Sequence, residues 1–387
     1  MTGRLFWSIT LCTLMAGTSA AQVQQLYAFT APEGNSNSGV ILASDGLLYG
    51  TTTQEVYRVN PSVPGVDEIL RSPLPDPVGG VIQASNGNFY GVTWTGGTGC
   101  PNLGGCGTIY SVTAEGAFAN LYFFDGTHGA NPLGGLIQAK NGKFYGTTFY
   151  GGAYGEGNGG GTIFEVTRKG VLRVLYNFCT KPNCLDGANP RASLVQGTDG
   201  QFYGITNAGG TDNYGTVFKI SSAGKLKTLH SFTGPDGTPL AALVQGTGRT
   251  FYGTTPVGGQ YGQGSIFEIT SAGKFAIVYS FCAGGWPCLD GGEPSGLSSA
   301  VDGWFSGGTY DGGELYGKIL GNGTLFEWSP TNGLQTSYVF CTSGGCSPGA
   351  SPSYPPVGGY GTTYAGANGY GIIFLEGSDN FRRTEKR

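Results

Sequence analysis

Charged residues and histidines are scarce in this sequence. Only 11% of the 387 residues are Asp, Glu, Lys or Arg, the formal net charge is −4, and there are two histidines. Binding to nucleic acid or to a membrane surface relies on clustered cations, so this composition disfavours both. His128 and His230 stand apart in the chain, with no metal-ligand spacing around them. We therefore expect no nucleic-acid partner, no metal and no cofactor.

Catalytic signatures and long helical patterns are missing as well. The chain contains no Gly-x-Ser-x-Gly elbow and no phosphate-binding loop. Beyond residue 21, no long apolar stripe has the period of a helix. No catalytic set can be assigned from these motifs. A carboxylate pair drawn from distant parts of the chain stays open, because glycoside chemistry needs two such groups only in space.

The first residues resemble a secretory signal peptide, which we place at residues 1–21. Arg4 supplies a positive charge, residues 5–16 form a short apolar run, and small residues at 19–21 suit cleavage. The run is too short to cross a bilayer comfortably, so we expect no membrane span after cleavage. An uncleaved anchor is the alternative.

A repeated phrase runs through this glycine-rich chain, which contains 74 Gly residues. It consists of an aromatic pair and Gly, two Thr residues, a Gly doublet, and then Gly-Thr, an aliphatic residue and Phe. The clearest copies cover residues 144–164, 202–218 and 251–267. Copies recur roughly every 50 residues, which indicates one supersecondary unit repeated along the chain.

Each unit contains four short segments rich in aromatic and β-branched residues, separated by turns rich in Gly, Asp, Asn and Ser. In the fourth copy these segments are 192–197, 201–207, 215–220 and 226–232. Four antiparallel strands per unit, repeated about seven times, predict an all-β fold, a seven-bladed β-propeller of four-stranded blades. An open solenoid of the same units is the alternative.

The two ends of the repeat region predict how the ring closes. The last copy lacks a fourth strand, whereas residues 26–29 (LYAF) match the fourth-strand phrase at 175–178 (LYNF). We expect residues 25–30 to form the outer strand of the last blade, which would remove two exposed sheet edges. This makes residues 22–376 a single propeller domain and leaves 377–387 as a polar tail.

Eight cysteines beyond residue 21 form four close pairs. These are Cys100 and Cys106, Cys179 and Cys184, Cys282 and Cys288, and Cys341 and Cys346. Three of the pairs directly follow a predicted fourth strand. We expect each pair to close its own loop as a disulfide, which stabilises the fold by about 2 kcal/mol in the chain-entropy model. The alternative, a metal site, is disfavoured because the spacings are wide and no His lies nearby. Disulfides also agree with export to an oxidising compartment.

The predicted topology separates two faces of the ring. The connections between strands one and two and between strands three and four are short turns. The connections between strands two and three, and from each blade to the next, are long and variable, and they carry all eight cysteines of the repeat region. Binding usually resides in long loops on a rigid scaffold, so this long-loop face is the predicted functional face.

Four of the loops between blades contain Asp-Gly, at Asp125, Asp186, Asp236 and Asp290. One interpretation is a ring of carboxylates that binds a cation or a polyol. The other is an Asx-type turn that starts each new blade. A calcium site needs about six to eight converging oxygens, which separate blades do not readily supply.

Aromatic and amide side chains also recur at defined positions. Trp94 and Trp286 lie in loops of the long-loop face, where Tyr150, Tyr154, Tyr214 and Tyr261 are found, and Trp304 replaces a repeat Tyr. These rings either stack on sugars or cap the blades as hydrophobic plugs. Gln83, Gln138, Gln196 and Gln245 recur on the innermost strands. They either line the central channel or satisfy backbone groups between blades.

The phrase FYGTT, followed by a Gly doublet and GT(I/V)F, resembles the GloVer tandem repeat. This repeat belongs to the choice-of-anchor group of bacterial surface and secreted proteins. The resemblance covers nearly all of the chain beyond residue 21, and it implies an extracytoplasmic, propeller-like repeat protein of unestablished activity. Members of the group often end in a sorting or anchoring tail, which residues 377–387 do not resemble.

Together these patterns predict a secreted or periplasmic, monomeric β-propeller. We expect it to be a binding module for an unidentified extracellular protein or glycan. The predicted ligand-binding residues are Trp94, Trp286, Asp125, Asp186, Asp236 and Asp290. One alternative is an extracytoplasmic carbohydrate-active enzyme, a lyase or a hydrolase, with its site on the long-loop face. The other is a structural component of the cell envelope.

Overall fold

A computed structural model gives the architecture of most of the chain. It describes residues 23–30, 35, 38–65, 67–71, 73–100, 104–154, 159–285, 288–299, 303–313, 323–340, 352–357, 359–363 and 372–376. The predicted signal peptide, the polar tail and Trp286 lie outside these residues. Cys341 and Cys346 also lie outside them, so the disulfide expected between these two residues stays a prediction.

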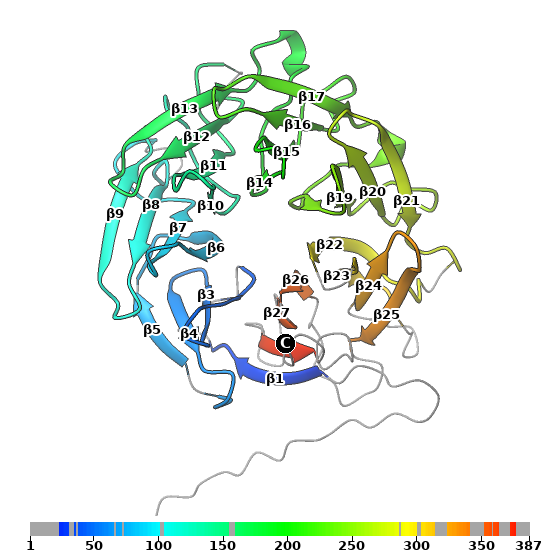
Figure 1. Cartoon of the computed structure of the whole chain (residues 1–387), viewed down its shortest axis with the longest axis horizontal. Coiled ribbons are helices and arrows are strands. Elements are labelled where there is room, and N and C mark those ends of the chain that lie inside the picture. Colours follow the sequence, from blue (N-terminus) through cyan, green and yellow to red (C-terminus); the bar gives the residue numbers. More distant parts are fainter. Residues whose placement is uncertain are drawn as a thin grey trace, which may run out of the picture.

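The described residues form seven four-stranded antiparallel sheets arranged in a ring, which confirms the seven-bladed β-propeller (Figure 1). Blade 1 contains β2 (Ile41–Leu42), β3 (Leu48–Thr51), β4 (Val56–Val59) and β5 (Asp67–Arg71). Blade 2 contains β6 (Pro77–Gln83), β7 (Phe89–Thr93), β8 (Thr108–Val112) and β9 (Phe118–Phe123). Blade 3 contains β10 (Ile137–Gln138), β11 (Phe144–Thr148), β12 (Thr162–Val166) and β13 (Leu172–Asn177).

The next three blades repeat this meander from the innermost to the outermost strand. Blade 4 contains β14 (Val195–Gln196), β15 (Phe202–Thr206), β16 (Thr216–Ile220) and β17 (Leu226–Ser231). Blade 5 contains β18 (Val244–Gln245), β19 (Thr250–Thr255), β20 (Ser265–Thr270) and β21 (Phe275–Ser280). Blade 6 contains β22 (Gly292–Ser299), β23 (Phe305–Asp311), β24 (Thr324–Ser329) and β25 (Gly333–Val339).

The last blade combines the two ends of the repeat region. It contains β26 (Pro352–Val357), β27 (Tyr360–Thr363), β28 (Ile372–Glu376) and, as its outer strand, β1 (Val23–Ala28). β1 pairs with β28 in antiparallel register, from Val23 opposite Glu376 to Ala28 opposite Ile372. Figure 1 shows β1 at the periphery of the ring beside the chain's last strands. The strand begins two residues before the predicted 25–30 segment, but it closes the ring as expected.

The core lies between the blades, and the Tyr-Gly pair of the repeat builds it. The Tyr145 ring stacks on Phe202 of the next blade with centroids 4.1 Å apart, and Tyr203 stacks on Phe251 at 4.0 Å. A Cβ on Gly204 would lie 2.6 Å from Cζ of Phe218. The Tyr therefore joins neighbouring blades, while the Gly makes room for an aromatic ring of its own blade.

The threonines of the repeat form a buried pair at the end of the second strand. Thr206 Oγ1 lies 2.9 Å from Thr216 Oγ1, and it also accepts the backbone N–H of Thr216 at 2.9 Å. Thr148 and Thr162 form the same pair in blade 3. These hydroxyls satisfy polar groups that the wide loop between strands two and three would leave unpaired.

The glutamines of the innermost strands link neighbouring blades at their short turns. Gln138 Oε1 accepts the backbone N–H of Ser85 at 2.8 Å, and Gln196 Oε1 accepts that of Lys140 at 3.0 Å. Gln83 and Gln245 make the equivalent bonds to blades 1 and 4. The structure thus shows the backbone-bonding role, although the turns that the amides bond are exposed rather than buried.

Candidate functional site

The long-loop face carries most of the irregular structure of the described chain. The loop between β11 and β12 runs from residue 149 to 161, whereas the turn between β12 and β13 covers only 167–171. Three disulfides lie in or beside the long loops, Cys100–Cys106, Cys179–Cys184 and Cys282–Cys288, as the spacing predicted. Such bonds are typical of proteins outside the reducing cytoplasm. The fourth predicted bond, Cys341 with Cys346, is not among them, because neither residue belongs to the described part of the chain.

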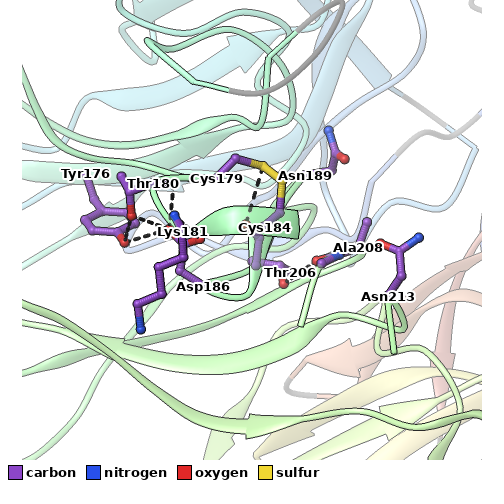
Figure 2. Close-up of a disulfide and its surroundings, with 12 residues drawn as sticks. Tyr176, Cys179, Thr180, Lys181, Cys184, Asp186, Asn189, Thr206, Ala208 and Asn213 are labelled. Atoms are coloured by element: carbon purple, nitrogen blue, oxygen red, sulfur yellow. Dashed lines mark hydrogen bonds between the residues drawn. A yellow bond between two sulfur atoms is a disulfide. The ribbon is translucent and has the colours of Figure 1, made fainter. Parts of the chain in front are cut away.

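Asp186 shows what the Asp-Gly loops do. Its carboxylate is fully buried beside the Cys179–Cys184 disulfide (Figure 2). Oδ2 accepts hydrogen bonds from the Tyr176 hydroxyl at 2.7 Å and from the Thr180 backbone N–H at 3.0 Å and hydroxyl at 2.7 Å. Oδ1 accepts the backbone N–H of Lys181 at 3.2 Å. All four hydrogen bonds come from its own loop and outer strand.

The same connection recurs in the neighbouring blades with different partners. Asp290 accepts the Tyr279 hydroxyl at 2.6 Å and the backbone N–H of Cys282 at 3.0 Å. In blade 4, which has no disulfide, Asp236 accepts from Thr233 in a capping box, and its Oδ2 lies 3.3 Å from Nε2 of His230. These carboxylates hold the loops to the outer strands.

The glycine after Asp186 is required by its position. Gly187 has φ +101°, and a Cβ there would lie 2.6 Å from Thr206 Oγ1 and 2.7 Å from Thr216 Oγ1. The Asp-Gly turn therefore places bare backbone on the threonine pair of the following blade. Ligand binding by these carboxylates stays a prediction, and their geometry favours the turn interpretation. No group of three or more His, Cys, Asp or Glu among the described residues is arranged to hold a metal.

Asp125 is the exception among the four. It receives the backbone N–H of His128 at 2.8 Å and lies 2.7 Å from Nδ1 of the same ring. Both side chains are about half exposed, at 49% and 51%. This pair is therefore available to solvent, unlike Asp186.

Aromatic rings on the long-loop face fall into two groups. Trp94 packs against Phe149 and Tyr150 of the next blade, with centroids 6.0 and 6.1 Å away, and it is half-buried. Its backbone carbonyl also accepts the Asn131 amide at 2.8 Å. Trp94 thus joins blades as a plug. The exposed rings include Tyr154 (51%), Tyr214 (41%) and Tyr261 (43%), one in the same connection of blades 3, 4 and 5, and Tyr310 (37%) on β23.

A mixed polar cluster, not anticipated from the sequence, lies where the long-loop face meets the centre of the ring. We call Arg191, Glu293, Tyr310 and Asp311 the axial cluster. Arg191 precedes the innermost strand of blade 4, and the register of β22 on β23 places Glu293 opposite Tyr310. Partial burial raises the pKa of Tyr310, with Arg191 acting to lower it and Glu293 to raise it. Burial raises the pKa of Glu293, and the Asp311 carboxylate raises it further.

The backbone of Glu293 marks the cluster as unusual. Glu293 has φ +54° and occupies the pre-proline position that Asn131 and Asn189 fill in other blades, at φ +54° and +55°. Asn tolerates this left-handed conformation, whereas Glu rarely adopts it and is strained there by about 1 kcal/mol or more. Retained strain of this kind is a feature of functional sites.

Elsewhere around the centre of the ring the chain is packed by small residues. A Cβ on Gly79 would collide with the backbone of Gly135, and one on Gly134 with the backbone of Ala192. Blades 2, 3 and 4 therefore meet through bare backbone. The signal for the axial cluster was present in the sequence as departures from the repeat, where Glu and Arg replace Asn and Leu. The proximity of Arg191 and Glu293 depends on how the closed ring places blades 4 and 6.

Comparisons with known proteins agree with this architecture. The Gloeobacter/Verrucomicrobia repeat model matches residues 56–256. No curated protein sequence matches the chain. The extracellular domain of a B. thetaiotaomicron protein described as a one-component system has a TM-score of 0.58 at 11% identity. The match covers 92% of this chain and 40% of that one, so this chain spans well under half of its length.

A gluconolactonase from Xanthomonas campestris is a weaker structural match. It has a TM-score of 0.46 at 13% identity, over 74% of this chain and 86% of that one. Identities this low show the fold alone, and the second likeness carries no argument about activity. Among the described residues, no helix has the length and apolarity needed to cross a bilayer.

Proposed function

The chain belongs to the Gloeobacter/Verrucomicrobia repeat family, and from this premise we propose that it is an exported propeller that binds a glycan on its long-loop face. Export is supported by the three local disulfides and by the signal-like residues 1–21. The bound ligand is a carbohydrate because the face combines exposed tyrosine rings with mixed hydrogen-bonding groups.

The observation that carries the proposal is the row of exposed tyrosines. The repeat tyrosines Tyr145 and Tyr203 are fully buried between blades, whereas Tyr154, Tyr214 and Tyr261 keep 41–51% of their surface exposed. These three occupy one connection in consecutive blades, so they follow the curve of the ring. A phenol offers a flat apolar face with a polar tip, which suits the alternating apolar and hydroxyl surfaces of a sugar.

The axial cluster would supply the directional contacts. Arg191 presents a fork of N–H donors, while the Glu293 and Asp311 carboxyl groups accept hydroxyl protons or, when protonated, donate one. A site with few placed polar groups beside aromatic rings has the general composition of a small-molecule site. The exposed tyrosines would hold the sugar chain in position, and the axial cluster would fix its orientation.

A glycan array with the wild-type protein tests this function, followed by titration of the best ligand. Tyr214→Ala and Tyr261→Ala should each weaken binding about threefold to tenfold, the loss expected for one ring contact. The matched control is Phe123→Ala, because Phe123 is an equally exposed ring (52%) on the outer strand of blade 2. Absence of binding to every glycan, or equal losses in all three variants, would contradict the proposal.

A second candidate is a carbohydrate-active enzyme at the axial cluster. The specific observation behind it is a carboxyl group with a raised pKa, Glu293, next to a second carboxyl, Asp311. Glycosidases use a pair of neighbouring carboxyl groups, one of which serves as general acid when its pKa is raised. Glu293→Gln separates the two functions. An enzyme would lose turnover and keep its affinity for the glycan, whereas a binding module shows no turnover before or after the change.

A further inference from the structure

Across blades 3 to 5, the two faces of the ring carry different charges. Acidic residues gather in the connections of the long-loop face and at the strand ends beside them, at Asp76, Asp125, Asp212, Asp236, Asp290, Glu293 and Asp311, in addition to the buried Asp186. Cations gather in the short turns of the opposite face, at Lys140, Lys143, Arg168, Lys169, Lys225, Arg249 and Lys274. Asp199 is the one acidic residue in the short turns of blades 3 to 5, all of which the structure describes. The short-turn face is therefore cationic over blades 3 to 5, although the chain has a net charge of −4 and the short turns of blades 1 and 2 carry Asp45 and Glu115.

The cations are densest on blade 3, in a surface we call the basic patch: Lys140, Lys143, Arg168, Lys169 and Arg173. The turns after β10 and β12 border a shallow, open depression of about 560 Å³, lined by Asn141, Gly142, Lys143, Thr167, Arg168, Lys169 and Val171. The two turns are about 25 residues apart in sequence, and the blade brings them side by side. The depression is thus built from the charged turns themselves.

One carboxylate serves this group of cations. Glu165 Oε1 lies 2.9 Å from Lys143 Nζ and 2.9 Å from Arg173 Nε. Arg168 donates to the hydroxyl of Ser85 at 2.6 Å, a neutral partner in blade 2. The side chains of Lys140 and Lys169 have no hydrogen bond or ion pair to any described residue, and both residues are exposed. Positive charge is therefore left in excess beside the depression.

We propose that the basic patch binds the anionic groups of an acidic polysaccharide and so orients the ring with its long-loop face outward. Charge complementarity defines the ligand class, since sulfate and carboxylate groups spaced along a sugar chain can reach several turns at once. The turns 139–143 and 167–171 contain no aromatic residue on which a nucleic-acid base could stack. Val171 is the apolar residue among those that line the depression, which is too little for insertion into lipid.

Binding to dextran sulfate tests the proposal, with neutral dextran as the matched probe that lacks only the anionic groups. The full exported chain should bind dextran sulfate at low salt, bind dextran far more weakly, and lose affinity as salt screens the charges. Lys169→Gln should weaken binding by roughly fivefold, the value of one cation at an anionic surface. Lys140→Gln combined with Lys169→Gln should weaken it further.

The control variant is Lys181→Gln, which removes the same charge from an exposed lysine on the long-loop face. It should change binding by less than about twofold, because the charge removed lies a blade's height away from the patch and is screened. Equal losses in Lys169→Gln and Lys181→Gln, or no binding to dextran sulfate at low salt, would overturn the proposal. Tighter binding to single-stranded DNA than to dextran sulfate would overturn the choice of ligand. Tyr214→Ala should leave this interaction unchanged, so failure here and failure of the long-loop site are distinguishable.

Discussion

Replacing Asp186 tests whether the Asp-Gly loops serve the scaffold or a ligand. Asp186→Ala removes the acceptor of four hydrogen bonds, from Tyr176, twice from Thr180, and from Lys181. Hydrogen bonds to a charged group contribute about 1.5–3 kcal/mol each, but these four form one network and are not additive. Thr180 and Lys181 are exposed and can turn to water after the change. We expect a loss of about 3–4 kcal/mol in the free energy of unfolding.

Asp186→Asn separates shape from charge. The amide is isosteric, but its NH₂ group must face either the Tyr176 and Thr180 donors or the backbone N–H of Lys181, so one side becomes a donor–donor contact. We expect a loss of about 1–2 kcal/mol. Asp125→Asn is the matched control, since Asp125 is half exposed and should change stability by less than about 0.5 kcal/mol.

Guanidinium denaturation of each variant measures these losses, with disulfides intact and with unfolding followed by two independent probes. A double-mutant cycle of Asp186→Ala with Tyr176→Phe should give a coupling energy of at least about 1 kcal/mol. A scaffold role for Asp186 is ruled out if Asp186→Ala unfolds like the wild type but loses a ligand. In that event the carboxylate is a binding group, and the geometry of the loop has been misinterpreted.

Three further predictions concern the scaffold. Gly204→Ala places a methyl 2.6 Å from the Phe218 ring and should cost about 2–3 kcal/mol in a denaturation experiment, whereas Gly200→Ala meets no atom within 4 Å and should cost about 1 kcal/mol because its φ is positive. Burial alone would raise the pKa of Glu165, but bonds from Arg173, Lys143 and Tyr145 lower it to about 2. Because that folded pKa is depressed, the ionised Glu165 should stabilise the fold fully above about pH 5, and this contribution should be lost between about pH 4.5 and 2. The loss should be about 1–2 kcal/mol in the free energy of unfolding, since solvent screens the exposed cations. Glu165→Gln should reduce this acid-induced loss. Replacing both Cys179 and Cys184 by Ser should cost about 2 kcal/mol in calorimetry, and a change below about 0.5 kcal/mol would contradict the loop-closure argument.

Much of the fold could be predicted because the repeat is local. Tyr203, Gly204 and the following threonine each occupy a fixed place in one blade, so a period in the sequence translates directly into a strand position. Cys179 and Cys184 are five positions apart, which leaves little choice of partner. Closure by β1 was predictable as well, because residues 26–29 carry a fourth-strand phrase that the last copy lacks.

The candidate sites were less predictable because they depend on which blades face each other. Trp94 has the sequence context of an exposed ring, yet it packs against Phe149 and Tyr150 of the next blade. The four Asp-Gly turns look alike in sequence, but Asp186 is fully buried and Asp125 is half exposed. Burial of a carboxylate follows from the packing of its loop, which the repeat pattern does not contain.

The number of blades, the strand order within each blade and the three local disulfide loops of the described chain all follow from the amino-acid sequence. Each of these depends on residues close together in the chain, where spacing and turn chemistry suffice. The approach of Arg191 to Tyr310 from another blade and the cationic short-turn face of blades 3 to 5 became visible in the folded ring. Contacts of this kind arise because the closed ring brings together residues more than a hundred positions apart in the chain. A short-range sequence pattern carries no information about which distant residues become neighbours.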